Sequence, residues 1–171
     1  MVRNARFIPC VLFLIFPGLV YSAEEPVVVT ATRTAQTVDA SLSAVSVIDR
    51  EEIEALQPLT VTDILRTVPG LTVSNTGGLG QPSSVFLRGS ESDHVLVLID
   101  GVKVGSTTLG STSFQFLDPD QIERIEVVRG PRSSLYGPDA IGGVIQIFTR
   151  DPAKAPRASA FATAGTDDYS K

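Results

Sequence analysis

The stretch His94–Val104, HVLVLIDGVKV, decides the fold of this chain. Val95–Ile99 is a run of five apolar residues, rich in β-branched side chains, that is too short for a helix and typical of a strand buried on both faces. Asp100-Gly101 then has the residue types of a type I′ turn, which sends the chain straight back along Val102–Val104. The stretch therefore predicts a β-hairpin at the core of a small sheet.

The segments around this hairpin alternate between short helices and short strands. Asp49 with Glu52 makes a capping-box pattern that predicts a helix ending at Gln57-Pro58. Thr60 with Asp63 opens a second short helix, which Pro69-Gly70 ends. Further strands are expected at Ser43–Ile48, Leu71–Val73, Val85–Leu87, Ile122–Arg129 and Val144–Phe148. Ile122–Arg129 alternates apolar and polar residues, so it is expected to be half-buried. The pattern as a whole predicts a small mixed α+β domain.

The first 23 residues differ in character from the rest. Arg3 and Arg6 precede the apolar run Phe7–Val20, and the small residues Ser22 and Ala23 follow it. This order is typical of a secretory signal peptide, with cleavage expected after Ser22. A membrane anchor is the alternative, but prolines and a glycine interrupt the run, and it is shorter than the roughly 20 residues of a spanning helix. The protein is therefore predicted to be exported.

Composition excludes several classes of function. The chain has 171 residues, of which 43% are hydrophobic and 19% charged, as in an ordinary globular domain. Its one cysteine, Cys10, lies in the signal, so the mature chain has no thiol for a disulfide, a zinc site or nucleophilic attack. Removing Arg3 and Arg6 from the 14 basic side chains leaves 12 against 19 acidic ones, a net charge near −7. This charge argues against nucleic acid as a partner.

The residues that carry enzyme chemistry are nearly absent. The sole histidine, His94, stands beside Asp93, but no nucleophile with a matching base can be placed. One histidine and no mature cysteine give no support for a metal site, and no cofactor is predicted. Two loops rich in glycine and serine, Ser74–Ser84 and Gly105–Ser113, lack the motif and the following helix of a phosphate cradle. Such loops can instead contact a ligand.

The two ends of the mature chain do not fit the core. Glu24–Thr37 reads EEPVVVTATRTAQT, which predicts an extended segment with no obvious place in a core. It is either a frayed edge strand or a segment that adds itself as a strand to a partner's sheet. After the linker Asp151–Pro156, residues Arg157–Lys171 alternate small or apolar with polar side chains, as in the first strand of a larger β structure whose remainder is absent.

Four segments, in this order and spacing, resemble one family. They are PGLTV at 69–73, VFLRG at 85–89, VLVLIDGV at 95–102 and IERIEVVRGPRSSLYGPDAIGGVIQI at 122–147. They are similar to the N-terminal plug of TonB-dependent outer-membrane receptors, most of all to the cobalamin-receptor branch. The resemblance covers about Glu25–Arg150. It implies an α+β fold with a small mixed four-stranded sheet, short helices and loops, followed by the start of a β-barrel strand.

The resemblance also divides the chain. It implies a signal peptide at 1–22, an extended TonB-box segment at 23–37, the plug domain at 38–150, and a linker with the first barrel strand at 151–171, the barrel being otherwise absent. In the family the TonB box pairs as a strand with TonB, the periplasmic energy-coupling protein, so strand addition becomes the favoured interpretation of the N-terminal segment. The matching residues are Pro26, Val27, Val28, Val29, Thr30 and Ala31.

The family further implies contacts with ligand and with the barrel. Position by position, ligand contacts fall on Pro82, Ser84, Glu91, Leu109 and Gly110. Pro82 and Glu91 depart from the cobalamin pattern, which leaves the substrate open. Arg88, Arg129 and Arg132 are either exposed charges at strand ends or partners of acidic groups on the barrel wall. The second interpretation is favoured because all three stand in the motif segments.

The function expected is that of an exported plug domain, with no enzymatic activity. It gates the TonB-powered uptake, by an outer-membrane active transporter, of a scarce nutrient such as cobalamin. The alternatives are a siderophore-type receptor plug and a free periplasmic TonB-binding module that transports nothing. The expected partners are TonB, a β-barrel, a small-molecule ligand and the outer membrane. The location is the outer membrane, or the periplasm if the barrel is truly absent.

Overall fold

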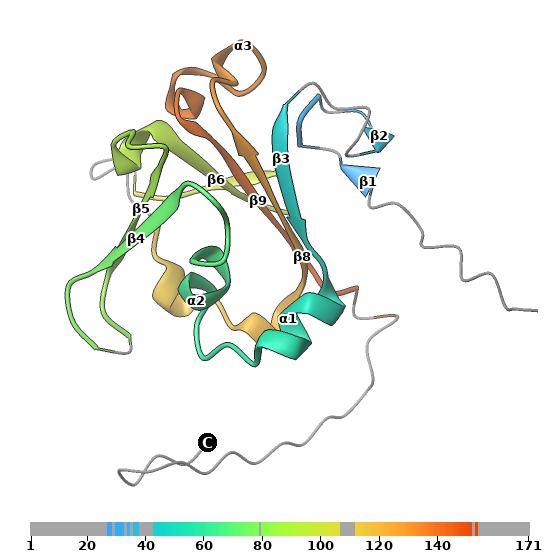
Figure 1. Ribbon diagram of the computed structural model, residues 1–171, viewed down its shortest axis with the longest axis vertical. Coiled ribbons are helices and arrows are strands. Elements are labelled where there is room, and N and C mark those ends of the chain that lie inside the picture. Colours follow the sequence, from blue (N-terminus) through green and yellow to red (C-terminus); the bar gives the residue numbers. More distant parts are fainter. Residues whose placement is uncertain are drawn as a thin grey trace, which may run out of the picture.

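The computed structural model describes residues 27–28, 30–32, 34, 36–37, 43–78, 80–106, 112–151 and 153. A mixed five-stranded sheet with strand order β3-β8-β9-β6-β7 organises these residues (Figure 1). Its strands are β3 (Ala44–Ile48), β6 (Val95–Ile99), β7 (Val102–Val104), β8 (Ile122–Arg129) and β9 (Gly143–Thr149). Only β6 and β9 pair in parallel within this sheet. The α+β class is confirmed, although the sheet has five strands where four were expected.

The hairpin β6–β7 forms where the sequence predicts it. Asp100 and Gly101 both have positive φ angles, +48° and +83°, as a type I′ turn requires. Val95–Leu98 are all buried. The hairpin is not the centre of the sheet, however, because β9 inserts between β8 and β6 and leaves β7 at an edge. Periodicity along one strand does not report which strand lies next to it, so this error could not be seen in the sequence.

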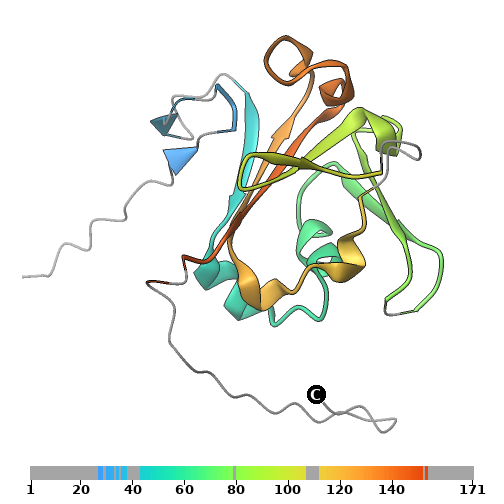
Figure 2. The ribbon, with the colours of Figure 1, turned by 180° about the vertical axis from the view of Figure 1, so that it is seen from behind.

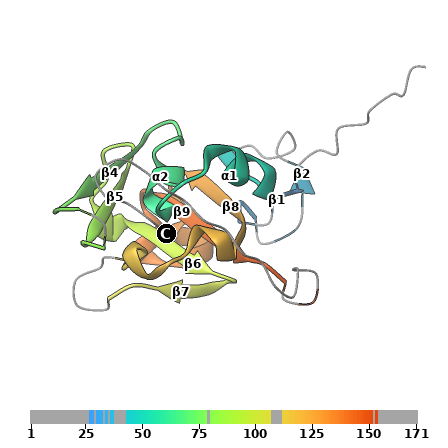
Figure 3. The same ribbon diagram turned by 90° about the horizontal axis from the view of Figure 1, so that it is seen from below.

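Two short helices and a second hairpin cover one face of the sheet (Figures 1 and 3). The elements are α1 (Arg50–Leu56), α2 (Val61–Leu65), β4 (Leu71–Asn75) and β5 (Ser83–Leu87). The predicted caps are present: Glu52 N donates to Asp49 Oδ1 at 2.9 Å, and Thr60 N donates to Asp63 Oδ2 at 3.0 Å. The main core lies between this layer and the sheet.

The opposite face of the sheet is also covered, as the view from behind shows (Figure 2). Leu96, Leu98 and Val144 pack against the turns α3 (Ser133–Tyr136) and η4 (Pro138–Ala140). Ala31, far away in the sequence, packs against Val128. Because both faces are covered, residues 125–128 of β8 are all buried. The expectation that this strand is half-buried is therefore wrong.

The start of β9 needs glycine. Gly143 has φ +154°, and a Cβ there would lie 2.3 Å from Val128 O and 2.4 Å from Leu87 Cδ2. No side chain fits such a gap, so β9 can reach the centre of the sheet only because its first residue has none.

Short elements complete the described chain. The 3₁₀ turns η1 (Ser92–His94), η2 (Phe114–Phe116) and η3 (Pro119–Gln121) join the strands, and Asp118 caps η3 as its Asp-Pro pair predicts. β1 (Val27–Val28) and β2 (Gln36–Thr37) pair antiparallel, so the N-terminal segment turns back on itself rather than running straight. Among the described residues, no helix is long and apolar enough to cross a membrane. The predicted strand at 157–171 lies outside the described residues.

Candidate functional site

The six residues of the predicted TonB box are divided by the structure. Val27 and Val28 form β1, while Pro26 and Val29 lie outside the described residues. Thr30 and Ala31 follow in a turn and are 0% and 2% exposed. The sequence analysis found no obvious place for this segment in a core, and that expectation is wrong for these two residues. They are buried against β8 and β9.

Thr30 is held through its hydroxyl, its amide and its carbonyl. Thr30 N and Oγ1 donate to Glu126 Oε2 at 2.9 and 2.6 Å, and Oγ1 lies 3.3 Å from Gln146 Oε1. Tyr136 Oη donates to Thr30 O at 2.9 Å. Glu126 and Gln146 stand directly opposite each other on β8 and β9. Four residues far apart in the sequence thus meet at one point on the second face of the sheet.

The carboxylate of Glu126 is 0% exposed, so its burial needs compensation. Arg124 Nε lies 3.1 Å from Glu126 Oε1, and the Arg124 guanidinium carbon stands 3.7 Å from the centroid of the Phe148 ring. The two donors of Thr30 add charge-assisted hydrogen bonds to this polar site. The sequence analysis missed Glu126, because an acidic residue in an alternating strand is typical of a solvent face. The one sequence signal that this face of the strand is buried was that Val128, two residues further along the strand, is apolar.

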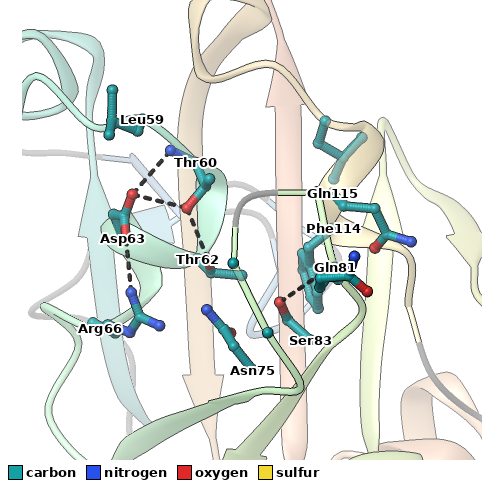
Figure 4. Close-up of a pocket in the computed structure, with 14 residues that line it drawn as sticks. Leu59, Thr60, Thr62, Asp63, Arg66, Asn75, Gln81, Ser83, Phe114 and Gln115 are labelled. Carbon is teal, nitrogen blue, oxygen red and sulfur yellow. Dashed lines mark hydrogen bonds and ion pairs between the residues drawn. The ribbon is translucent and has the colours of Figure 1, made fainter. Parts of the chain in front are cut away.

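A polar cavity of about 290 Å³ lies on the other flank of the molecule, between α2, the β4–β5 hairpin and η2 (Figure 4). Asp63 accepts from Thr60 on one side and pairs with Arg66 at 2.7 Å on the other. The β4–β5 hairpin supplies Asn75, Gln81 and Ser83 to the opposite wall. Gln115 Oε1 is buried and has no hydrogen-bond partner in the described part of the chain. The glycine-rich loop Ser74–Ser84 is the one feature of the sequence that pointed to this part of the molecule.

The predicted ligand contacts that the structure describes, Pro82, Ser84 and Glu91, do not line the 290 Å³ cavity. Pro82 is exposed on the β4–β5 loop, where its carbonyl accepts from Thr76 N at 3.3 Å. Ser84 lines a small separate cavity together with Ser92, the residue that follows the exposed Glu91. The structure therefore brings Ser84 close to the turn that carries Glu91. Leu109 and Gly110 lie outside the described residues. The role of all five residues stays a prediction.

The three predicted arginines gather around neighbouring turns. Arg88 N donates to Gly70 O at 2.7 Å, and Arg129 Nη1 donates to the adjacent Pro69 O at 3.1 Å. Arg132 Nη1 donates to Pro131 O at 3.0 Å, while its Nε is buried without a partner in the part of the chain that is described. Within that same part, none of the three forms an ion pair with a carboxylate.

His94 has a structural position. Its carbonyl accepts from Gly142 N at 2.9 Å, which ties η1 to the start of β9. Asp93 is exposed beside it. Over the described ranges, no three His, Cys, Asp or Glu side chains gather as they would around a metal ion.

The sheet, its two covers and the docked N-terminal segment define a class of protein that comparison with known families identifies. The family model described as TonB-dependent Receptor Plug Domain matches residues 37–144. The chain belongs to this family of plug domains.

More particular likenesses are to vitamin B12 transporters. The chain is 49% identical over 146 residues to vitamin B12 transporter BtuB of Vibrio vulnificus, which is 85% of this chain and 24% of that protein. It is 42% identical over 160 residues to BtuB of Photobacterium profundum, covering 91% of this chain and 26% of that protein. The chain thus spans about a quarter of the length of these relatives.

Solved structures of receptors share the fold. The ferric enterobactin receptor PfeA of Pseudomonas aeruginosa superposes with a TM-score of 0.51 and 33% identity, over 63% of this chain and 18% of that one. The ferric yersiniabactin uptake receptor FyuA of Yersinia pestis gives 0.52 and 29%, over 64% and 17%. The resemblance read from the motif segments is therefore confirmed at the level of the family.

Proposed function

We propose that this chain is the plug of an outer-membrane transporter that takes up a scarce small molecule, cobalamin in the first place, with energy supplied by TonB. The observation that carries the proposal is the 49% identity to a vitamin B12 transporter over 85% of the chain. By this proposal the chain acts through a conformational change of the plug and not through catalysis. Its relatives are named as transporters and receptors, and their chemistry requires no enzyme in the plug.

Energy coupling is proposed to pass through residues 26–31. β1 has only β2 as a strand neighbour in the described part of the sheet, so its other edge carries backbone groups that an added strand can pair with. A partner that reads backbone hydrogen bonds needs no particular side chains at Val27 and Val28. The open edge of β1 in the described sheet supports a strand-adding partner such as TonB.

A siderophore is the second candidate substrate, because the solved structures that share the fold include siderophore receptors. Identity favours cobalamin: it is 49% and 42% for the B12 transporters against 33% and 29% for the enterobactin and yersiniabactin receptors. The predicted contacts Pro82, Ser84 and Glu91 are all at least partly exposed and so accessible to a ligand.

Contact with a surrounding barrel is proposed to use Arg88, Arg129 and Arg132. The buried Nε of Arg132 is a donor for which the described residues supply no acceptor, and a buried unpaired donor is costly. A carboxylate on the barrel wall would supply that acceptor. By this proposal the plug stands in the outer membrane.

The test is a chimeric receptor. Residues 24–150 replace the corresponding plug of the V. vulnificus vitamin B12 transporter, in cells that lack a cobalamin receptor of their own. We expect uptake of radiolabelled cobalamin that disappears when TonB is deleted. Val28→Pro should abolish uptake, because proline removes a backbone donor from the strand that TonB would pair with. The control is Thr32→Val, a change at an exposed residue that should leave uptake unaltered. A proline on another strand, such as Thr72→Pro, is unsuitable as a control because it breaks β4.

Several results would contradict the proposal. Uptake of ferric siderophore but not of cobalamin would show that the substrate is the second candidate, a siderophore. The chimera could also reach the outer membrane and transport neither cobalamin nor ferric siderophore, while its soluble plug binds TonB. That result would leave the free TonB-binding module as the remaining hypothesis for this chain. Uptake that persists without TonB would exclude energy coupling through this chain.

A further inference from the structure

We propose that Glu126, Gln146 and Tyr136 form a binding site that recognises Thr30 and holds the N-terminal segment on the second face of the sheet. These three residues are called the Thr30 clamp. It deepens the proposed function, since the segment it holds is the one proposed to meet TonB. The clamp itself concerns only contacts within this chain, so it is tested without TonB.

The clamp is selective for a side chain that carries a hydroxyl group. The Thr30 hydroxyl donates to the fully buried Glu126 carboxylate at 2.6 Å, the shortest of the contacts given for this residue. Valine has the shape of threonine but no donor, and it would leave the carboxylate with one fewer partner in a site without solvent. Serine keeps the donor. The site therefore selects a hydroxyl rather than a shape.

The backbone of Thr30 is held as firmly as its side chain. Its N–H donates to Glu126, and its carbonyl accepts from Tyr136 Oη at 2.9 Å. With both backbone groups engaged, the segment cannot slide by a residue without losing the hydroxyl contact as well. The clamp thus fixes which residues are docked, and a partner strand that pairs along β1 must stop before Thr30 or open the clamp.

The clamp also determines which elements receive a force that is applied to the N-terminal segment. Glu126 lies on β8, Gln146 on β9 and Tyr136 on α3, whereas the chain itself continues from Thr30 to β2 and then to β3. A displacement of Thr30 therefore acts directly on the central strand pair and on the α3 turn, ahead of the chain that leads to β3. Tyr136 belongs to the RGPRSSLYG segment of the family motif, which gives this tyrosine a positioning role toward the N-terminal segment.

The clamp is tested by thiol labelling of the mature chain, which has no cysteine of its own. Ala31→Cys places the only thiol at a position that is 2% exposed and packed against Val128, so a maleimide reacts there only when the segment undocks. Adding Thr30→Val or Tyr136→Phe should raise the labelling rate at least about tenfold, the change that follows from losing one buried hydrogen bond. Adding Thr30→Ser should leave the rate within about threefold of the parent, because the hydroxyl is retained.

Thr32→Val is the matched control. Thr32 is an exposed threonine two residues away whose hydroxyl contacts Thr34, and removing it should leave the rate at position 31 unchanged. Equal rates for the Thr30→Val and Thr32→Val variants would overturn the proposal. A separate thiol, Ser83→Cys, reports on the fold as a whole, since Ser83 is 8% exposed and lies on β5.

Labelling at position 83 should not respond to Thr30→Val. An equal rise at positions 31 and 83 would also overturn the proposal, because the hydroxyl would then stabilise the whole fold rather than the docked segment. Hydrogen exchange of the Thr30 amide, measured with the native Ala31, repeats the comparison without an introduced thiol. Loss of TonB binding in a separate pull-down would contradict the proposed function and leave the labelling result standing.

Discussion

At the scale of single residues, Arg50 shows how one side chain joins two elements. Its Nη1 donates to Pro119 O and Ile122 O at 3.0 and 2.9 Å, which ties the start of α1 to η3 and β8. Its Nε donates to Glu54 Oε1 at 2.7 Å, one helical turn along. The guanidinium is thereby held between the helix surface and the end of a strand.

The first prediction concerns the pKa of Glu54. The hydrogen bond from Arg50, and then its charge, hold the pKa of this carboxyl below its ordinary value of 4.5. The stabilisation from Glu54 is therefore present above the pKa of the unfolded chain and is lost as pH falls through the lower, folded pKa. Arg50→Met should raise the Glu54 pKa toward 4.5 in an NMR titration of its carboxyl carbon. An unchanged pKa would show that the contact does not form in solution.

The second prediction concerns Asp100, the turn residue of the β6–β7 hairpin. Its carboxylate accepts from Thr149 N at 2.9 Å and from Thr149 Oγ1 at 2.6 Å, so the turn also holds the end of β9. Asp100→Ala removes both bonds and places alanine at φ +48°, which should lower the free energy of unfolding by about 2 kcal/mol in urea. Asp100→Asn keeps an acceptor and tolerates this φ, so it should cost less than about 1 kcal/mol. Equal losses would mean that the carboxylate contacts contribute little.

At the scale of elements, the third prediction tests the start of β9. Gly143→Ala forces a Cβ into Val128 O and Leu87 Cδ2, so it should lower the free energy of unfolding by more than about 3 kcal/mol or prevent folding. Gly89→Ala is the control: it has φ +78° but no atom within 4 Å of the new Cβ, so its cost should be about 1 kcal/mol. Circular dichroism during urea unfolding measures both. Similar costs would show that the close approach at β9 relaxes readily.

Local elements could be predicted from the sequence because local rules determine them. The caps at Asp49 and Thr60 and the turn at Asp100-Gly101 each depend on residues within one or two turns. The order of the strands could not be predicted in this way. β6 pairs with β9 across more than forty residues, and no periodicity within either strand records that pairing.

The candidate site was predicted in outline only. The family motif pointed to residues 26–31, but the contact of Thr30 with Glu126 joins positions 96 residues apart. Glu126 has the side chain of a solvent-facing residue and is buried because the N-terminal segment lies over it. A polar group that is buried by a distant segment leaves no mark on its own neighbourhood in the sequence.

At the scale of the whole molecule, the two candidate sites lie on opposite flanks. The β4–β5 hairpin with its cavity stands on one side of the sheet, and the β1–β2 segment on the other, in all three ribbon views (Figures 1, 2 and 3). The β8–β9 strand pair lies between them. Any influence of a ligand on the docked segment must therefore cross the sheet.

The fourth prediction is that the plug folds without its N-terminal segment. Every residue of the main core, from Ile48 to Ile147, lies after β2. A chain that starts at Ser43 should keep its sheet, as followed by circular dichroism. It should lose about 1–3 kcal/mol of the free energy of unfolding, because Ala31 no longer covers Val128 and Glu126 loses two donors. A truncated chain that fails to fold would show that the segment belongs to the core.

The place of β9 in the strand order has a consequence for how the protein folds as it is synthesised. Synthesis proceeds from the N-terminus, and β9 is made after the four other strands of the five-stranded sheet, yet it occupies the middle of that sheet. Until Thr149 has emerged, β8 and β6 have no strand between them, and Gln146 is not there to meet Thr30. The pairs β3–β8 and β6–β7 can form earlier, but each keeps one apolar edge without a neighbour until β9 joins them. Such a chain depends on protection from aggregation until β9 arrives.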